Sequence, residues 1–184
     1  MTKSTRLIGL GLALALAAGV AQAQTVKTVG GAPMFSNKNI VENAVNSKDH
    51  TTLVAAVKAA GLVDTLASAG PFTVFAPTDK AFGKLPKGTV EGLVQPASRG
   101  QLTQILTYHV VPGRLTAADL MAQVKAGGGR LELTTVEGDG LVVRQVKGGL
   151  RLTDTKGRSS MITIPDVIQS NGVIHVVDTV LMPS

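Results

Sequence analysis

The sequence contains no cysteine among its 184 residues. A chain without cysteine cannot form disulfide bonds, so its stability must come from packing and hydrogen bonding. It also has no thiol beside a leader sequence that could carry a lipid. We therefore exclude a disulfide-stapled scaffold and a lipoprotein.

Aromatic residues are scarce, at 3% of the chain, with one tyrosine, four phenylalanines and no tryptophan. Sugar-binding platforms usually need exposed aromatic rings, so this scarcity weakens the case for carbohydrate binding. The case stays open, because loops can bind sugars through hydrogen bonds alone. Phe72, Phe75 and Phe82 fall within one short segment, and we expect them in the core.

Acidic residues are in the minority, with 12 against 18 lysines and arginines, for a net charge of +6. The excess is small, and the basic residues are scattered without interleaved aromatics. Nucleic-acid-binding proteins usually concentrate positive charge on one face. We therefore expect a mainly solvated charge pattern and no nucleic-acid partner.

The sequence lacks an apolar run long enough to cross a bilayer core of about 30 Å as a helix. Its apolar run at residues 7–20 follows a short basic start and precedes the small-residue triplet Ala21-Gln22-Ala23. This order is typical of a signal peptide, here residues 1–23, cleaved before Gln24. An uncleaved anchor is the alternative. A cleaved signal peptide predicts a secreted or periplasmic protein without a membrane anchor.

Motifs for catalysis are missing: there is no G-x-S-x-G elbow, no S-x-x-K with a fitting partner and no H-E-x-x-H. His50, His109 and His175 are too far apart in the sequence to indicate a metal site. His175 and Asp178 lie three positions apart on an expected strand, so they point to opposite faces and cannot form a dyad. His50 lies in a polar turn and is expected to be solvated. We predict no enzymatic activity, no cofactor and no metal site.

The densest local pattern is segment 70–82, G-P-F-T-V-F-A-P-T-D-K-A-F. Its first two residues favour a turn, and residues 72–75 favour a strand with apolar side chains on both faces. Thr78 is a suitable N-cap, and Asp79 in the first turn suits the helix dipole. We expect a strand covered on both sides and followed directly by a helix.

Helical patterns come first in the chain and strand patterns second, without an internal repeat, and this order favours an α+β fold. Residues 24–36 are polar and contain glycines, which predicts a flexible lead-in to one domain over residues 37–184. Helices are expected to begin at Ser36 or Asn37 and near residues 52, 62, 78, 89, 98 and 116. Strands are expected at 72–75, 108–111, 130–134, 141–146, 150–153, 161–164 and 173–180.

Three blocks of the sequence resemble the fasciclin domain family: segment 70–82, the pair Tyr108-His109, and residues 171–183, N-G-V-I-H-V-V-D-T-V-L-M-P. They occur in the family's order, and the resemblance covers residues 37–183. It implies a β-wedge of two sheets flanked by N-terminal helices. It also implies that His109 is held by hydrogen bonds to the Thr78–Asp79 region of the first block. The structural signature residues it implies are Thr78, Asp79, His109, Asn171, Gly172 and His175.

The resemblance implies two candidate contact regions as well. Adhesion by fasciclin domains is linked to the tyrosine–histidine region, here Tyr108 and His109, and to an acidic–aliphatic pair before the last block. That pair is Asp166 and Val167, after Pro165, and the family more often has isoleucine at the position of Val167. A turn aspartate after proline is an equal alternative for Asp166. On an extended segment Tyr108 and His109 would point to opposite sides, with one facing the core.

These observations predict an exported, non-enzymatic adhesion or protein-interaction module. We expect a monomer whose partner is an unknown protein or a component of the cell envelope or matrix. The alternative is a periplasmic or extracellular protein that binds a small ligand or polysaccharide, with a hydrolase a distant third. An adhesion module should expose residues 108–111 or Asp166 and have no deep pocket. A ligand-binding protein should have a pocket with converging polar groups.

Overall fold

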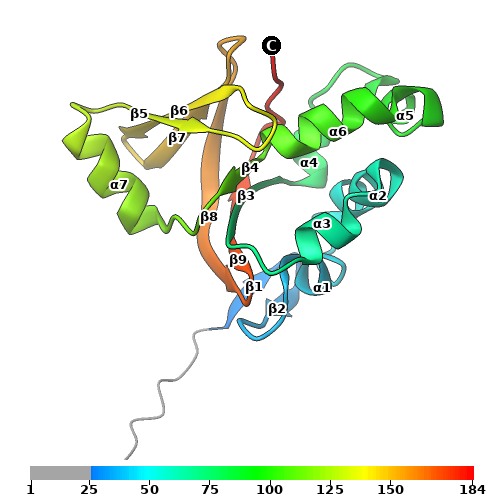
Figure 1. Ribbon diagram of the computed structural model, residues 1–184, viewed down its shortest axis with the longest axis horizontal. Coiled ribbons are helices and arrows are strands. Elements are labelled where there is room, and N and C mark those ends of the chain that lie inside the picture. The colour runs from blue at the N-terminus through cyan, green and yellow to red at the C-terminus, as the bar shows by residue number, and fades with distance from the viewer. Residues whose placement is uncertain (1–25) are drawn as a thin grey trace, which may run out of the picture.

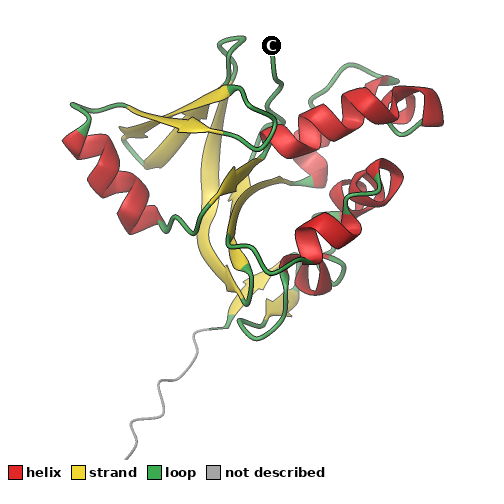
Figure 2. Ribbon diagram, in the orientation of Figure 1, coloured by secondary structure: helices red, strands yellow, loops and turns green. Residues whose placement is uncertain are grey.

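The computed structural model describes residues 26–184, so the predicted signal peptide lies outside the described residues. The helices and strands form an α+β fold, as the sequence predicts (Figure 2). The helices are α1 (Ile40–Ala44), α2 (Thr51–Ala60), α3 (Val63–Ala67), α4 (Asp79–Phe82), α5 (Thr89–Leu93), α6 (Arg99–Tyr108) and α7 (Ala117–Ala126). The strands are β1 (Lys27–Val29), β2 (Ala32–Met34), β3 (Phe72–Pro77), β4 (Val110–Pro112), β5 (Leu131–Thr134), β6 (Gly140–Val146), β7 (Gly149–Thr153), β8 (Ser159–Gln169) and β9 (Gly172–Val177).

The long strand β8 joins two sheets into a wedge. The strand order is β4-β3-β9-β8-β7-β6-β5, and β8 pairs with β7 near its start and with β9 along most of its length. Two register shifts, between Ile162 and Ile164 and between Ile164 and Val167, interrupt the β8–β9 ladder. Such irregularities bend a strand, and β8 curves through the centre of the molecule in Figure 1. This bend lets one strand serve both sheets.

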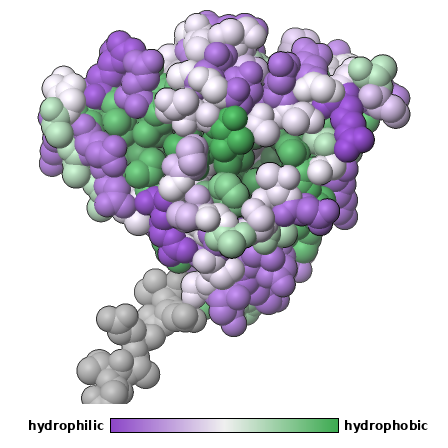
Figure 3. Space-filling view, viewed as in Figure 1, coloured by the Kyte–Doolittle hydropathy of each residue, from purple (hydrophilic) through white to green (hydrophobic). Residues whose placement is uncertain are grey.

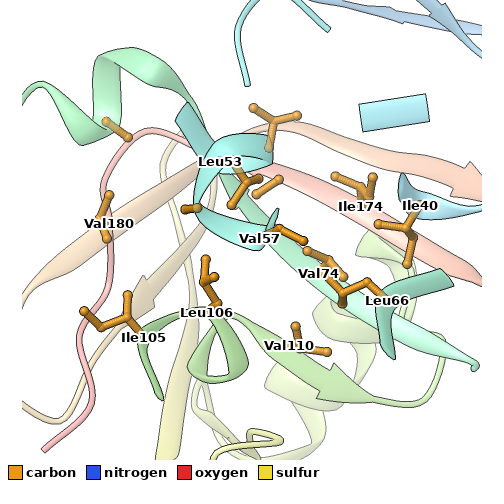
Figure 4. Close-up of a cluster of buried hydrophobic side chains, with 14 of the residues drawn as sticks. Ile40, Leu53, Val57, Leu66, Val74, Ile105, Leu106, Val110, Ile174 and Val180 are labelled. Atoms are coloured by element: carbon orange, nitrogen blue, oxygen red, sulfur yellow. The ribbon is translucent and has the colours of Figure 1, made fainter. Parts of the chain in front are cut away.

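Strand β3 lies between the two halves of the hydrophobic core, which confirms the prediction that it is covered on both sides. Val74 and Ala76 face a cluster built with α1, α2, α3 and α6, part of which Figure 4 shows. Phe75 faces the opposite cluster, which includes Leu120 of α7 and Leu152 of β7. Phe75 has no exposed surface. The strand pairs antiparallel with β4 and parallel with β9.

The helices are divided between the two sides of the wedge. Helices α1 to α6 lie on the right in Figure 1, as expected for the N-terminal helices, whereas α7 lies alone on the left. The buried residues Leu120 and Val124 of α7 pack on Leu141 and Val143 of β6. Hydrophobic residues are visible between these two groups of helices in Figure 3.

The prediction of a flexible lead-in is wrong for residues 27–36. Strands β1 and β2 form an antiparallel hairpin, and Val29 and Met34 are buried against α1. The hairpin turn is fixed as well, because the carbonyl group of Gly30 accepts a hydrogen bond from Lys48 N–H. The polar and glycine-rich composition that indicated flexibility belongs to a tight turn between two short strands.

Local signals placed most helix ends correctly. Gly61 ends α2 in the left-handed conformation, and the hydroxyl groups of Thr78 and Thr116 cap α4 and α7. The predicted cap of α1 is wrong, because Asn39 caps it instead, in a reciprocal capping box with Glu42. That box satisfies two backbone N–H donors, those of Asn39 and Glu42, which neither Ser36 nor Asn37 does.

Candidate functional site

Tyr108 and His109 do not lie on an extended segment, contrary to the sequence prediction. Helix α6 continues through Tyr108, and His109 is its C-cap residue with φ −85° and ψ 0°. Tyr108 is fully buried and His109 is 3% exposed, so the prediction that only one of them faces the core is also wrong. Their rings meet edge to face, with centroids 6.4 Å apart. In this conformation neither side chain can touch a partner directly.

The Tyr108 side chain is hydrogen-bonded to the sheet that contains β6. Its hydroxyl group donates a hydrogen bond to the carbonyl oxygen of Gly140, at 2.9 Å, where β6 begins. Burial raises the pKa of Tyr108 to about 12, so the phenol stays protonated and remains a donor. The side chain therefore connects the end of α6 to the second sheet.

His109 braces the C-terminal tail against α6. Nε2 accepts a hydrogen bond from the N–H group of Leu181, at 3.1 Å, so Nδ1 carries the proton and donates to the carbonyl oxygen of Ile105, at 2.8 Å. Burial lowers the pKa of His109 to about 4, against the opposing effect of the Ile105 carbonyl. The predicted link to the Thr78–Asp79 region is wrong, because both ring nitrogens are bonded elsewhere. The first block is reached at Phe75 instead, whose N–H group donates to the backbone carbonyl oxygen of His109 at 2.9 Å.

Asp79 instead holds the start of α2. Its carboxylate accepts hydrogen bonds from the hydroxyl and N–H groups of Thr51 and from the N–H group of Thr52. Burial tends to raise the pKa of Asp79, but the hydrogen bonds from Thr51 and Thr52 together lower it. The N–H groups of Thr51 and Thr52, which have no partner within α2, are thus satisfied by a residue of α4.

Asn171 and Gly172 connect β9 to the helices and to β3. The amide of Asn171 donates to the carbonyl oxygens of Leu66 and Ser68 and accepts from Ile40 N–H. A Cβ atom at Gly172 would collide with the carbonyl oxygen of Phe72, so only glycine allows this close approach of β9 to β3. Both residues therefore act in assembly of the fold.

His175 joins three parts of the chain at the centre of the sheet. The ring is fully buried and stacks on Phe75, with centroids 5.7 Å apart. Nδ1 accepts from Asp166 N–H at 3.2 Å, so Nε2–H donates to the carbonyl oxygen of Leu115 at 2.8 Å. Burial lowers the pKa of His175. Asp178 has different partners, including Met161 N–H and Lys84, so the two residues form no dyad.

Asp166 lies in a bulge of β8. Its φ of 54° is the one positive φ of a non-glycine residue within 26–184. Its Oδ1 accepts a hydrogen bond from Ala117 N–H, at 2.7 Å, at the first residue of α7. The sequence alternatives were a contact residue and a turn aspartate, and the structure shows a strand residue with a strained backbone that caps a helix.

The neighbours of Asp166 differ in exposure. Pro165 is half-buried, like Asp166, and its carbonyl oxygen accepts a hydrogen bond from the ammonium group of Lys27. Val167 is 1% exposed and packs in the cluster under the N-terminal helices. Of the five candidate contact residues, only Pro165 and Asp166 therefore reach the surface.

A surface cleft of about 520 Å³ lies beside Thr78 and Asp79, and no sequence pattern predicts it. Its apolar floor includes Val29 and Val176, and lysine and aspartate side chains line the rest. These lining residues come from the β1 region, the 48–49 turn, α4, β8 and β9, and no linear motif contains them. The charged lining residues are Lys48, Asp49, Asp79, Lys80, Lys84 and Asp178.

His50 is buried rather than solvated, which corrects the prediction for this residue. It is 3% exposed, and its Nδ1 lies 2.8 Å from the hydroxyl oxygen of Ser47. Within residues 26–184 its Nε2 has no hydrogen-bond partner, and His50 lines an apolar cavity of about 60 Å³ between the helices and the sheet. Burial lowers the pKa of His50, with the backbone of Ala76 opposing the shift.

Two features are absent from residues 26–184. No three histidine or carboxylate side chains converge in an arrangement that could hold a metal ion. No helix in the same range is both long and apolar enough to cross a membrane.

Known proteins with similar sequences identify the family to which this fold belongs. The family model described as Fasciclin domain matches residues 48–183. The chain is 44% identical over 181 residues to protein sll1483 of Synechocystis sp., covering 97% of this chain and 93% of that protein. It is 34% identical over 160 residues to immunogenic protein MPB70 of Mycobacterium bovis, covering 81% and 71%.

The fold has a counterpart among solved structures. A FAS1 domain pair from the insect cell adhesion molecule Fasciclin I superposes with a TM-score of 0.71 at 21% identity, over 79% of this chain and 51% of that chain. At this identity the likeness shows the fold alone. Together with the family match, these findings show that the chain belongs to the fasciclin domain family.

Proposed function

We propose that the chain is an exported, non-enzymatic adhesion or protein-interaction module. Family membership supports this proposal, and the protein with the similar solved fold is named a cell adhesion molecule. The signal peptide expected from residues 1–23 would place the mature chain in the periplasm or outside the cell. Its partner would be a protein or a component of the cell envelope or matrix, bound by a monomer.

The observation that carries the proposal is the position of Asp166. Its carboxylate is half-exposed, and Oδ1 is held by Ala117 while Oδ2 has no hydrogen bond within residues 26–184. The positive φ of Asp166 stores strain, and strained residues concentrate at functional sites. We place the contact region at Pro165 and Asp166. His175 holds the backbone of Asp166 from behind.

In this proposal Tyr108, His109 and Val167 are buried and do not contact the partner; their role is structural. Each lies in the core that positions the bulge of β8 and the end of α6. A change at these residues would reach the contact region through the packing. This assigns an indirect role to the tyrosine–histidine pair.

The hydrogen bonding of His109 and His175 supports a non-enzymatic role. Both ring nitrogens of His109 and both of His175 are bonded to backbone groups. A general base needs a ring nitrogen that can reach a substrate proton. These two imidazoles offer none.

An adhesion assay tests the proposal. Beads coated with the mature chain should adhere to cells of the source organism in a saturable way, and free chain should compete. Asp166→Asn keeps the shape and the hydrogen bond to Ala117 but removes the charge, and it should weaken adhesion at least tenfold. The matched control is Asp64→Asn, since Asp64 is exposed on α3. Equal adhesion of the two variants would contradict the assigned contact region, and absence of saturable adhesion would contradict the function.

One observation favours a second candidate function, the binding of a small ligand. The cleft beside Thr78 has the volume of a ligand site and combines an apolar floor with charged walls. A ligand bound there should raise the melting temperature, because it binds only the folded chain. Lys80→Ala should abolish that increase while bead adhesion is unchanged.

A further inference from the structure

The outer face of β5, β6 and β7 is open to solvent. Alternate residues of these strands point inward and are buried under α7, among them Leu133, Leu141 and Leu152. Their neighbours point to the other side, where Glu132 and Arg144 are exposed and Arg151 is half-buried. The side chains on this face are therefore not part of the hydrophobic core.

The strand register brings arginines together on this face. Arg144 of β6 lies directly opposite Arg151 of β7. On the other side of β6, Leu131 pairs with Val143, so Arg130 comes next to Arg144 as the ladder runs out. Adjacent strands are about 4.8 Å apart, so the Cα positions of the three arginines form a short row across the sheet. Like charges directly opposite each other destabilise a strand pair.

Arg144 and Arg151 lack a counter-charge among residues 26–184. Arg130 forms an ion pair with Glu132, at 2.9 Å, and Glu132 is the one acidic residue in these three strands. Within residues 26–184, neither Arg144 nor Arg151 forms an ion pair, and the buried Nε of Arg151 has no hydrogen-bond partner. Arg144 and Arg151 repel each other, and their guanidinium groups have N–H donors that are not used within the chain. This arrangement indicates that they bind an anion from another molecule.

We propose that this arginine row, Arg130, Arg144 and Arg151, binds a linear acidic polysaccharide through its carboxylate groups. The guanidinium fork pairs with a carboxylate through two parallel hydrogen bonds. Next to the row, the hydroxyl groups of Thr153 and Ser159 lie 3.3 Å apart on the same face and suit the hydroxyl groups of a sugar. Charges repeated along one chain match a row better than the scattered charges of a folded acidic protein.

Nucleic acid fits this face less well. Bases bind to open surfaces mainly by stacking on aromatic side chains. Strands β5, β6 and β7 contain no aromatic residue. The charge of the row and the absence of stacking surfaces together favour a sugar polymer over DNA or RNA.

The inference rests on the proposed function, since it names a partner class for an adhesion module, but it uses a different surface from Asp166. Polygalacturonate is the probe, and its binding to the full chain is measured by calorimetry at low and moderate salt. We expect Arg144→Gln/Arg151→Gln to lose at least tenfold in affinity. The control Lys58→Gln/Lys87→Gln removes the same charge from exposed residues of α2 and of the segment before α5, and should bind as the parent does.

Two further variants separate recognition from charge alone. Arg144→Lys/Arg151→Lys keeps the charge but not the planar fork, and should lose several-fold in affinity. Glu132→Gln frees Arg130 and should bind several-fold more tightly. Equal binding by the arginine and lysine double-glutamine variants would overturn the proposal, and so would tighter binding of DNA or poly-glutamate than of polygalacturonate. If polygalacturonate binding fails while the beads still adhere through Asp166, the inference fails and the proposed function stands.

Discussion

The Nε2 atom of His109 accepts a hydrogen bond from the N–H group of Leu181, 72 positions later in the chain. This bond ties the end of α6 to the tail that follows β9. Together with the bond from Nδ1 to Ile105, it satisfies both ring nitrogens in a site without water access. His109 thus connects α6, in the helical half of the chain, to the segment that follows the last strand.

His109→Ala should lower the melting temperature. The substitution leaves Leu181 N–H unpaired, which costs about 1–3 kcal/mol, and it adds a cavity. Thermal unfolding and bead adhesion should be measured on the same purified variant. Unchanged melting with abolished adhesion would overturn the bracing role and make His109 a direct contact.

The unfolding free energy should fall as the pH drops from about 6.5 toward 4. The pKa of His109 is about 4 when folded and 6.5 in its ordinary state, so only the unfolded chain takes up a proton in this window. The loss is about 1.4 kcal/mol per pH unit, or about 3 kcal/mol in total, and it is absent above the window. His50 and His175, whose pKa values are also lowered by burial, add to the slope.

Urea titrations at several pH values measure this dependence. The parent should show a steeper decline than His109→Gln, which has no titrating group at this position. A flat profile between pH 7 and 4.5 would contradict the burial of the neutral imidazoles.

Phe75→Ala should cost about 3–5 kcal/mol, because it removes a fully buried ring between the two core clusters. Chemical denaturation measures the loss. Phe35→Ala is the matched control, since Phe35 is 40% exposed, and it should cost below about 0.5 kcal/mol. A loss below about 1 kcal/mol at Phe75 would show that β3 is not the centre of the core.

Asp166→Ala should destabilise the fold more than Asp166→Gly. Both lose the bond to Ala117 N–H at the start of α7, which is worth about 1 kcal/mol. Alanine must also adopt a φ of 54°, whereas glycine does so without strain. Denaturation of the two variants in parallel gives the difference, and equal losses would argue against a strained backbone.

Arg144→Gln should stabilise the protein by about 0.2–1 kcal/mol, because it removes a like-charge pair across β6 and β7. The gain should shrink in high salt, where surface charges are screened. Unfolding curves at two salt concentrations test this. A clear loss of stability would show that Arg144 is needed for packing and would weaken its assignment to binding.

Patterns that depend on near neighbours could be predicted from the sequence. The caps by Thr78 and Thr116 and the end of α2 at Gly61 follow from residues within one turn, and so does the strand at 72–75. The α+β class follows from the order of these elements. The hairpin of β1 and β2 could not be predicted, because its strands are three residues long and acquire their stability from Val29 and Met34 in a distant core.

The candidate site was harder to predict, because its contacts join distant positions. His109 reaches Leu181, and His175 reaches Leu115, across 72 and 60 positions. The sequence identified these residues but could not identify their partners. The strand β8 was expected to end before Pro165, yet it continues through a bulge, where proline is tolerated because the ladder is interrupted.

The parallel pairing of β3 with β9 also determines when the protein can fold. Phe75 lies beside His175, one hundred positions later, and β9 is the strand that pairs with β3 on this side. The entropy cost of closing the long loop between them comes before the β3–β9 pairing can stabilise the fold. Such long-range pairing slows folding. A nascent or translocating chain therefore lacks its central sheet until nearly all of its 184 residues are available. For the exported chain that we propose, this late closure would delay compaction until nearly all of the polypeptide has crossed the membrane.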